Sequence, residues 1–308
     1  MKIKSNKKII LIVMGVIVIM SLLGLGALSS YREINEEKCF TMEEINELQA
    51  TMSGAPVHII RTKASKEVKV QLHGKARQEI KLAAEIDNKA VVVGVKRKYE
   101  LPIPEDLFLD IYIPEEYGGN LSIKTSAGIV KLDSFNLASF TLNTSSGGLE
   151  AEQLNAEKIS INTSSGKLKI KRLEAAELKI KGSSSQINID ECIAKEAKIE
   201  ISSGSVTLEN SSGNFDLKGT AGDVLIAYKE FENQNINVGT TAGNVTLVIP
   251  STSEFLFETK TVTGKIQSDF PVNAEESTDK RKVEGQIGTK SNKVIIQTTT
   301  GNIKILKK

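Results

Sequence analysis

Aromatic residues, cysteine and histidine are all scarce in this 308-residue chain, which has no tryptophan and is only 5% aromatic. Two cysteines (Cys39, Cys192) and two histidines (His58, His73) are too few for a typical Cys/His zinc site or a histidine-based catalytic triad. The 23 glycines and 6 prolines exclude collagen-like and low-complexity chains, and two cysteines exclude a disulfide scaffold. We therefore expect neither a metal nor a cofactor.

An excess of charge of one sign is also missing. The 40 Lys and Arg residues nearly balance the 38 Asp and Glu residues, which leaves a net charge of +2. Proteins that bind nucleic acids usually carry a marked basic excess. We therefore expect no nucleic-acid partner.

The chain has one long uncharged apolar run, from Ile9 to Leu28, and it follows four lysines and no acid. About 20 apolar helical residues cross a hydrocarbon core of about 30 Å. We predict a transmembrane helix over residues 9–28, a cytoplasmic basic tail over 1–8 and export of the rest, because basic residues stay on the cytoplasmic side. A cleaved signal peptide is the alternative, although the run is longer than the usual apolar core of about 7–15 residues.

The exported part begins with a polar, acid-rich stretch, residues 29–46, which we interpret as a solvated spacer with room for a short helix around Thr41 to Leu48. Residues 47–116 then alternate apolar and polar with period two, which is typical of half-buried strands. Asp87-Asn88 separates two such runs and predicts a hairpin turn. We expect an irregular β region here.

A repeat of the form T-S/A-S/A-G recurs through positions 117–308, and each copy ends in a corner residue. The corner glycines are Gly128, Gly147, Gly166, Gly204, Gly222, Gly243, Gly264 and Gly301, with Ser185 in the same place in one repeat. Subtracting successive corner numbers gives steps between 18 and 21, followed by one final step of 37. A nearly fixed period in this range indicates a solenoid.

Counted from the corner residue as position 0, positions −7, −5, +2 and +4 are apolar in 34 of 36 cases, whereas the whole chain is 40% hydrophobic. Each repeat is therefore predicted to be one rung of two short strands, stacked about 4.8 Å from the next, so that equivalent residues form columns. We predict an all-β β-solenoid of about nine rungs, about 45 Å long, and expect the long step to be an excursion around residues 273–293. Each glycine is expected to turn the chain with positive φ.

Cys192 occupies position +7, where earlier repeats carry Phe135, Leu154 and Leu173. We therefore expect a buried free thiol. A disulfide with Cys39 is the alternative in an exported protein, but no pattern in the sequence indicates one.

The repeated T-S/A-S/A-G-x-φ-x-φ unit behind an N-terminal apolar segment resembles the "putative adhesin" β-strand repeat family of unknown function. The layout is similar to that of the Lia-type membrane-anchored proteins of Gram-positive bacteria, and the resemblance covers about residues 45–306. It implies a protein of the cell membrane with an extracytoplasmic domain, acting as an adhesin or beside an envelope-stress system. It implies no catalytic residues.

An outward strip of lysines at and near position −4 is the candidate binding site: Lys124, Lys179, Lys181, Lys198, Lys218 and Lys260. Glu152, Glu157, Glu174, Glu177, Glu191 and Glu196 mark an acidic opposite side. We expect a non-catalytic envelope protein whose partner is an anionic cell-wall polymer, lipid head groups or another envelope protein. A sensing role in an envelope-stress response and a carbohydrate-active β-helix enzyme are the alternatives. For the enzyme, Asp190-Glu191 and Glu150/Glu152 are the available carboxylates, and they lack a consistent partner.

Overall fold

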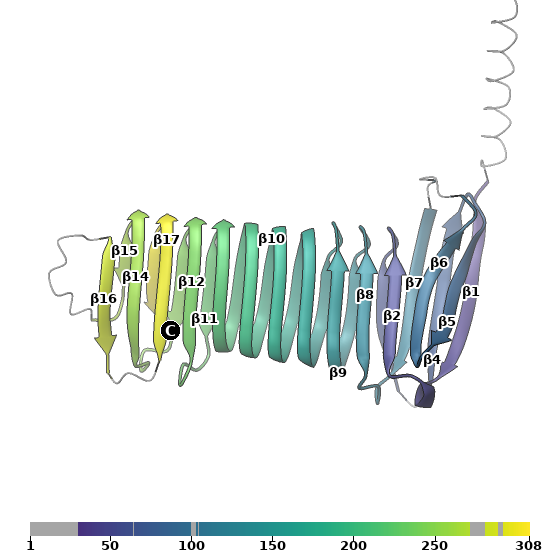
Figure 1. The fold of residues 1–308 in the computed structure, drawn as a ribbon, viewed down its shortest axis with the longest axis horizontal. Coiled ribbons are helices and arrows are strands. Elements are labelled where there is room, and N and C mark those ends of the chain that lie inside the picture. The colour runs from purple at the N-terminus through teal and green to yellow at the C-terminus, as the bar shows by residue number, and fades with distance from the viewer. Residues whose placement is uncertain (1–29, 64, 100–102, 104, 272–280, 289–291) are drawn as a thin grey trace, which may run out of the picture.

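The computed structural model describes residues 30–63, 65–99, 103, 105–271, 281–288 and 292–308, and this part of the chain is all-β (Figure 1). The strands are stacked along one axis into a rod. The elements are β1 (Arg32–Thr41), the 3-10 turn η1 (Met42–Glu44), β2 (Glu47–Met52), β3 (Val57–Thr62), β4 (Glu67–Ala76), β5 (Ile80–Asp87), β6 (Ala90–Arg97), β7 (Glu105–Pro114), β8 (Asn120–Thr125), β9 (Val130–Thr144), β10 (Leu149–Ala221), β11 (Val224–Tyr228), β12 (Asn235–Ala242), β13 (Val245–Ile249), β14 (Phe255–Thr263), β15 (Ile266–Ser268), β16 (Lys282–Ile287), β17 (Lys293–Thr300) and β18 (Ile303–Lys307).

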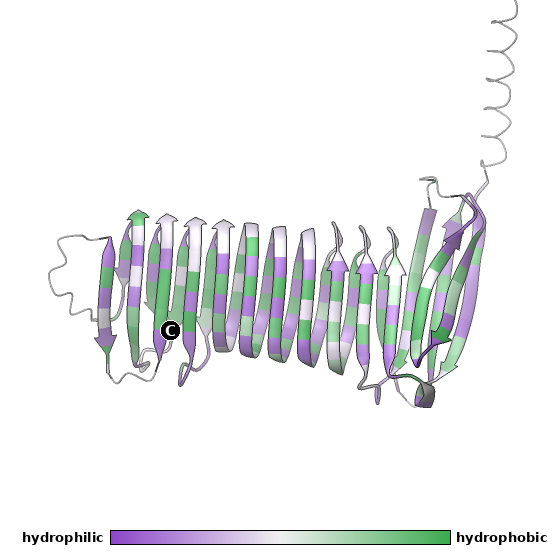
Figure 2. Cartoon of the chain, in the orientation of Figure 1, coloured by the Kyte–Doolittle hydropathy of each residue, from purple (hydrophilic) through white to green (hydrophobic). Residues whose placement is uncertain are grey.

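Successive rungs pair in parallel, which confirms the predicted repeat. Phe140 lies between Leu121 of the rung before and Ile159 of the rung after. In the four predicted columns, every residue except Ile266 and Ser268 is buried. In Figure 2 the strands accordingly carry alternating hydrophobic and polar bands. The stacked aliphatic columns form the core and keep the corners at one edge of the rod.

Positive φ explains only half of the corner glycines. Gly204, Gly222, Gly243 and Gly301 have φ between +122° and +148°, whereas Gly128, Gly147, Gly166 and Gly264 do not adopt positive φ. All eight share a different constraint, because a Cβ atom on any of them would lie within 2.2 Å of the carbonyl oxygen of the corner residue one rung away. The prediction of positive φ at every corner was therefore wrong for four of them. Close backbone stacking is the general cause of the glycine column.

The structure contains one further rung, formed by β2 and β3, before the nine that the repeat predicted. β2 pairs in parallel with β8, so that Leu48 lies against Leu121, and β3 pairs with the start of β9, so that Val57 lies against Val130. Its corner contains Ala55 in place of glycine, and the carbonyl oxygen of Ala55 faces Gly128. The region predicted as irregular, 47–116, therefore contains a regular rung.

The last two rungs stack in the reverse of their sequence order. β12 and β13 pair with β17 and β18, and these in turn pair with β14 and β15. The C-terminal strands therefore fill a slot between two rungs that precede them in sequence. Residues 282–287, within the expected excursion, form β16, which pairs antiparallel with β14 at the end of the rod. Stacking in simple sequence order was the wrong expectation for this end.

The N-terminal end of the rod is closed by a cap of antiparallel strands. On one side of the rod the spatial order is β3, β7, β4 and β1. On the other side β2 pairs with β6, and β6 forms a hairpin with β5. The predicted hairpin is present, but its turn residues are Asn88 and Lys89, both with positive φ, and not the predicted Asp87-Asn88, because Asp87 is the last residue of β5. The stretch interpreted as a spacer, 29–46, instead contains strand β1. The short helix expected around Thr41 to Leu48 is reduced to the 3-10 turn η1, because β2 already begins at Glu47.

Charged side chains of β1 reach across to the free edge of β5. The Glu36 carboxylate accepts a hydrogen bond from the Leu82 N–H (2.6 Å), and the Lys38 ammonium donates one to the Ala84 carbonyl (2.8 Å). Inward charge of this kind satisfies backbone groups that would otherwise be free to pair with another strand. Side chains of β1 therefore protect the free edge of β5.

The predicted transmembrane segment, residues 9–28, and the basic tail before it lie outside the described residues. Within residues 30–308, the parts that the structure describes contain no helix of the length and hydropathy needed to cross a membrane.

The two thiols are predicted to differ in reactivity. Cys192 is fully buried and free, as the column pattern predicted, and Cys39 is free and exposed on β1. Burial raises the pKa of Cys192 to about 12, so that its thiolate is not formed at neutral pH. We expect a thiol reagent to label one cysteine in the native protein and both in denaturant. Two native labels would contradict this packing, and no label in denaturant without reductant would indicate a disulfide.

Candidate functional site

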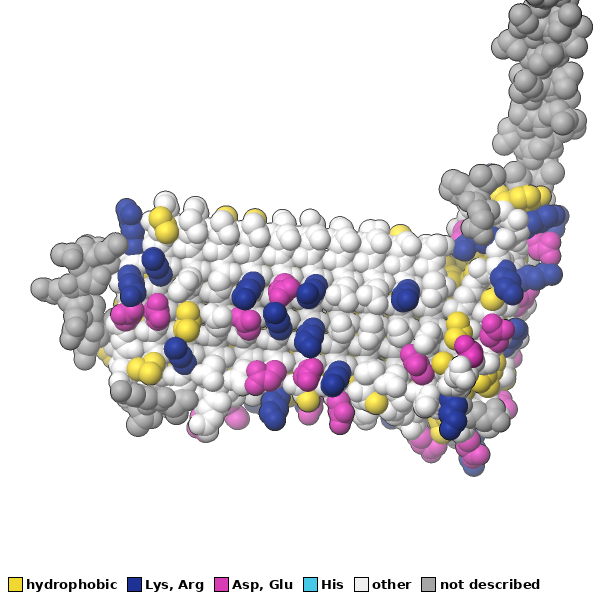
Figure 3. Space-filling view, viewed as in Figure 1, with side chains coloured by type: hydrophobic (Ala, Val, Ile, Leu, Met, Phe, Trp, Pro, Cys, Tyr) yellow, Lys and Arg dark blue, Asp and Glu magenta, His cyan; other side chains and the backbone are white. Residues whose placement is uncertain are grey.

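Three of the six strip lysines are held in ion pairs on the outer face of β10. The Glu200 carboxylate lies between Lys198 (2.9 Å) and Lys181 (3.3 Å), and Lys179 lies 3.6 Å from Glu177. Hydrogen bonds from Lys198 and then from Lys181 lower the pKa of Glu200. The middle of the strip is therefore partly neutralised by the protein itself, which the sequence pattern did not predict. Figure 3 shows the resulting row of basic and acidic side chains across the middle of this face.

The other three lysines, Lys124, Lys218 and Lys260, take part in none of the ion pairs found among the described residues. Lys124 and Lys218 are five rungs apart, which corresponds to about 24 Å. Because β17 is inserted between β12 and β14, Lys260 lies three rungs beyond Lys218. The strip is consequently longer and more widely spaced than sequential stacking implies.

A groove of about 710 Å³ runs along the corners between Lys124 and Lys218. Counted from the corner residue, the side chains at position −4 form one side of the groove and the serine and threonine hydroxyls at position −2 form the other. The residues at position −3 form its floor. The lining residues are Lys124, Thr125, Asn143, Thr144, Ser145, Asn162, Thr163, Ser164, Lys181, Gly182, Ser183, Glu200, Ile201, Ser202, Lys218, Gly219 and Thr220. We call this the corner groove.

Local hydrogen bonds hold the floor and one side of the corner groove in place. The buried hydroxyls of Thr125 and Thr144 accept hydrogen bonds from the backbone N–H groups of Gly128 (3.1 Å) and Gly147 (2.9 Å). The Asn162 side chain donates to that of Asn143 one rung away (3.0 Å). Side chains that are already held in place lose little conformational entropy when a ligand binds.

The corner ridge beside the groove is uncharged. Positions −3 to 0 contain no Asp, Glu, Lys or Arg in any of the nine predicted rungs, and positions −2 and −1 are exposed in all of them. Every side chain at positions −2 and −1 is serine or threonine except Ala127, Ala221, Ala242 and Val262. The site as a whole therefore presents an exposed row of hydroxyls bordered by amides and well-separated ammonium groups.

Two of the four carboxylates considered for catalysis are engaged in ion pairs. Glu191 pairs with Arg172 (2.5 Å), and Glu152 pairs with Lys171 (2.6 Å). Both pairs lie on the side that the sequence predicted to be acidic, and their bases offset part of that charge. A glycosidase needs two carboxylates that flank a substrate. Glu191 and Glu152 are each held in an ion pair with a different basic side chain.

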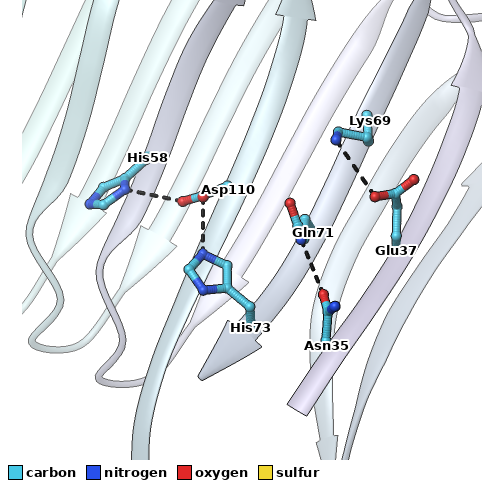
Figure 4. A network of polar contacts seen from close by, with 7 residues as sticks. All are labelled: Asn35, Glu37, His58, Lys69, Gln71, His73 and Asp110. Atoms are coloured by element: carbon cyan, nitrogen blue, oxygen red, sulfur yellow. Dashed lines mark hydrogen bonds and ion pairs between the residues drawn. The ribbon is translucent and has the colours of Figure 1, made fainter. Parts of the chain in front are cut away.

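The two histidines meet through an aspartate. His58 on β3 and His73 on β4 are separated by β7 and do not lie on neighbouring strands. Asp110 on β7 lies between them, with one oxygen 3.0 Å from His58 Nδ1 and the other 3.0 Å from His73 Nε2 (Figure 4). Both imidazoles thus face the same carboxylate from opposite sides. No group of three or more metal-binding side chains with suitable geometry occurs among the described residues.

The stacked rungs, the glycine column and the antiparallel caps define a class of repetitive all-β domains. The Toastrack DUF4097 family model matches residues 45–306, and the chain belongs to this family. This agrees with the resemblance found in the sequence.

The solved structures that match the chain share little sequence with it. It is similar to a "putative lipid binding protein" from Parabacteroides distasonis (11% identity, 89% of this chain and 97% of that chain, TM-score 0.48). It is also similar to a "putative adhesin" from Bacteroides fragilis (12% identity, 89% of this chain and 97% of that chain, TM-score 0.43). No curated protein matches the chain significantly.

Proposed function

We propose that this chain is a non-catalytic cell-envelope protein, anchored in the membrane by residues 9–28, that binds an anionic envelope polymer along the corner groove. The observation that carries the proposal is the groove itself, which is continuous over several rungs and ends at two lysines, Lys124 and Lys218, that are not ion-paired. A linear polymer fits such a site because the rungs repeat about every 4.8 Å along its length.

Hydroxyls and amides along the groove would accept and donate hydrogen bonds to a polyol or sugar chain. The lysines would pair with its phosphate or carboxylate groups. Because these charges are exposed to solvent, their contribution is screened by salt. Binding is therefore expected to weaken as ionic strength rises.

The test is retention of the purified full chain on isolated cell-wall material. We expect the double variant Lys124→Glu/Lys218→Glu to bind about tenfold more weakly at low salt, since it replaces attraction by repulsion at both ends of the groove. The matched control is Lys158→Glu/Lys195→Glu, which makes the same charge change at lysines that do not line the groove. Equal retention of both variants, or loss of binding in the control alone, would contradict the proposal.

A further inference from the structure

The first described residues pack against the segment 76–81 at the outer end of the cap, and this segment in turn contacts residues 96–99. The Tyr31 ring lies 4.7 Å from the guanidinium of Arg77, and Arg32 pairs with Ala76 in the β1–β4 ladder. The Tyr99 N–H donates a hydrogen bond to the Gln78 side chain (2.9 Å). We call residues 30–32, 76–81 and 96–99 the cap tip.

The cap tip has a composition unlike the rest of the protein. Tyr31 is 49% exposed and Tyr99 is 45% exposed, and both belong to the few large hydrophobic side chains on the described surface. Their neighbours are mainly basic. Residues 29–308 contain 36 basic and 38 acidic residues, and six of the basic and one of the acidic residues lie in the cap tip. The remainder of this part of the chain therefore has 30 basic and 37 acidic residues. The basic residues are Arg32, Arg77, Lys81, Lys96, Arg97 and Lys98, and the acid is Glu79.

Internal ion pairs neutralise only part of this charge. Lys81 lies 3.1 Å from Glu79, and Arg97 is paired with Glu105 on β7. Counting Glu105 with the cap tip still leaves four more basic than acidic residues there. Figure 3 shows hydrophobic and basic side chains together at this N-terminal end of the described chain. Exposed tyrosine beside Lys and Arg is the composition found where proteins meet lipid head groups.

The length of the chain places this surface beside the membrane. Tyr31 follows Leu28, the last residue of the apolar run, by three residues, which span at most about 11 Å. The headgroup layer on each side of a bilayer is itself about 5–8 Å thick. If residues 9–28 cross the membrane, Tyr31 must therefore lie in or next to that layer.

We propose that the cap tip rests on the anionic head groups of the outer leaflet, with Tyr31 and Tyr99 at the interface and the basic side chains paired with lipid phosphates. This inference rests on the proposed membrane anchor. The remainder of the exported chain is net acidic and is repelled by the same surface. The contact therefore orients the rod, with its cap on the membrane and its distal rungs away from it.

The absence of tryptophan makes the test direct, because one introduced tryptophan is the only one in the protein. The full chain with Tyr99→Trp is reconstituted in vesicles of phosphatidylcholine and phosphatidylglycerol that contain brominated lipid. We expect tryptophan emission from this variant to fall about twofold relative to vesicles without bromine, as for a side chain at the interface. Val262→Trp, at a 48% exposed position on the C-terminal strand β14, is the matched control and is expected to be unquenched. Tyr31→Trp provides a second reporter if Tyr99→Trp does not fold.

Two further variants separate the possible failures. Leu22→Trp reports on the anchor, and quenching at residue 22 but not at residues 31 and 99 would overturn the cap-tip contact while the anchor stands. No quenching at residue 22 would overturn the anchor itself. Arg77→Glu/Lys98→Glu in the Tyr99→Trp background should restore most of the lost emission in anionic vesicles. Unchanged quenching in this variant would overturn the role of the basic residues.

Discussion

Deleting residues 293–308 is expected to detach the C-terminal end of the rod and to expose its core. These residues form β17 and β18, the rung that lies between β12–β13 and β14–β15. Burial of Val294, Ile296, Ile303 and Ile305 is worth about 1.5–3 kcal/mol for each side chain. Their combined loss approaches the whole net stability of a typical domain, about 5–15 kcal/mol. The effect should therefore exceed that of losing a terminal rung.

Hydrogen exchange checks this prediction, since residues 255–271 should lose protection together with β12 and β13. The matched control deletes residues 150–168, one full central repeat, after which Leu149 and Lys169 still follow the column pattern. We expect this control to fold as a shorter rod. Retained protection of β14 in the C-terminal deletion would show that this rung is not needed to hold β14 in place.

Gly222→Ala is expected to destabilise the rod by about 2–3 kcal/mol or more, because a Cβ atom there meets backbone and the conformation is strained. The added atom would lie 1.5 Å from the carbonyl oxygen of Gly204, and Gly222 has a φ of +134°. A backbone atom cannot move aside as a flexible side chain can. The rungs on either side would therefore have to separate locally.

Urea unfolding measures this effect as a lower midpoint. Gly239→Ala is the matched control, because its Cβ would meet nothing within 4 Å and its φ is not positive. We expect the control to stay within about 0.5 kcal/mol of the parent, because the added methyl group meets no neighbouring atom. An equal shift in both variants would mean that loss of glycine, and not the close approach of the corners, governs stability.

Sequence periodicity predicted the core of the rod because burial in a solenoid depends on position within the repeat alone. Leu178, Ile180, Ile187 and Ile189 are buried as their columns required. Because burial depends only on position within the repeat, the periodicity did not predict the order in which the last rungs stack. Rungs with equivalent columns can replace one another in the stack, so the pattern around Thr298 does not say which neighbours that rung will have.

The candidate site was predicted less completely. The alternation placed Lys181, Lys198 and Glu200 on the outer face, but the sequence could not show that one carboxylate would bridge both ammonium groups. The rung at β2–β3 was missed because Ala55 replaces the corner glycine. The cap tip was missed because its three segments are far apart in sequence and meet only when β1, β4 and β6 are folded.

Parallel strands stacked in register about 4.8 Å apart are also the geometry of an amyloid fibril. Left open, either end of this rod would be a template on which further chains could add. The chain opposes this growth by reversing strand direction at both ends, with β4 and β1 at one and, at the other, β16, which pairs with β14 and leaves β15 uncovered. At the N-terminal end Glu36 and Lys38 also occupy backbone groups that a new strand would need. The protein thus contains a short fibril-like lattice whose length is set by its own caps.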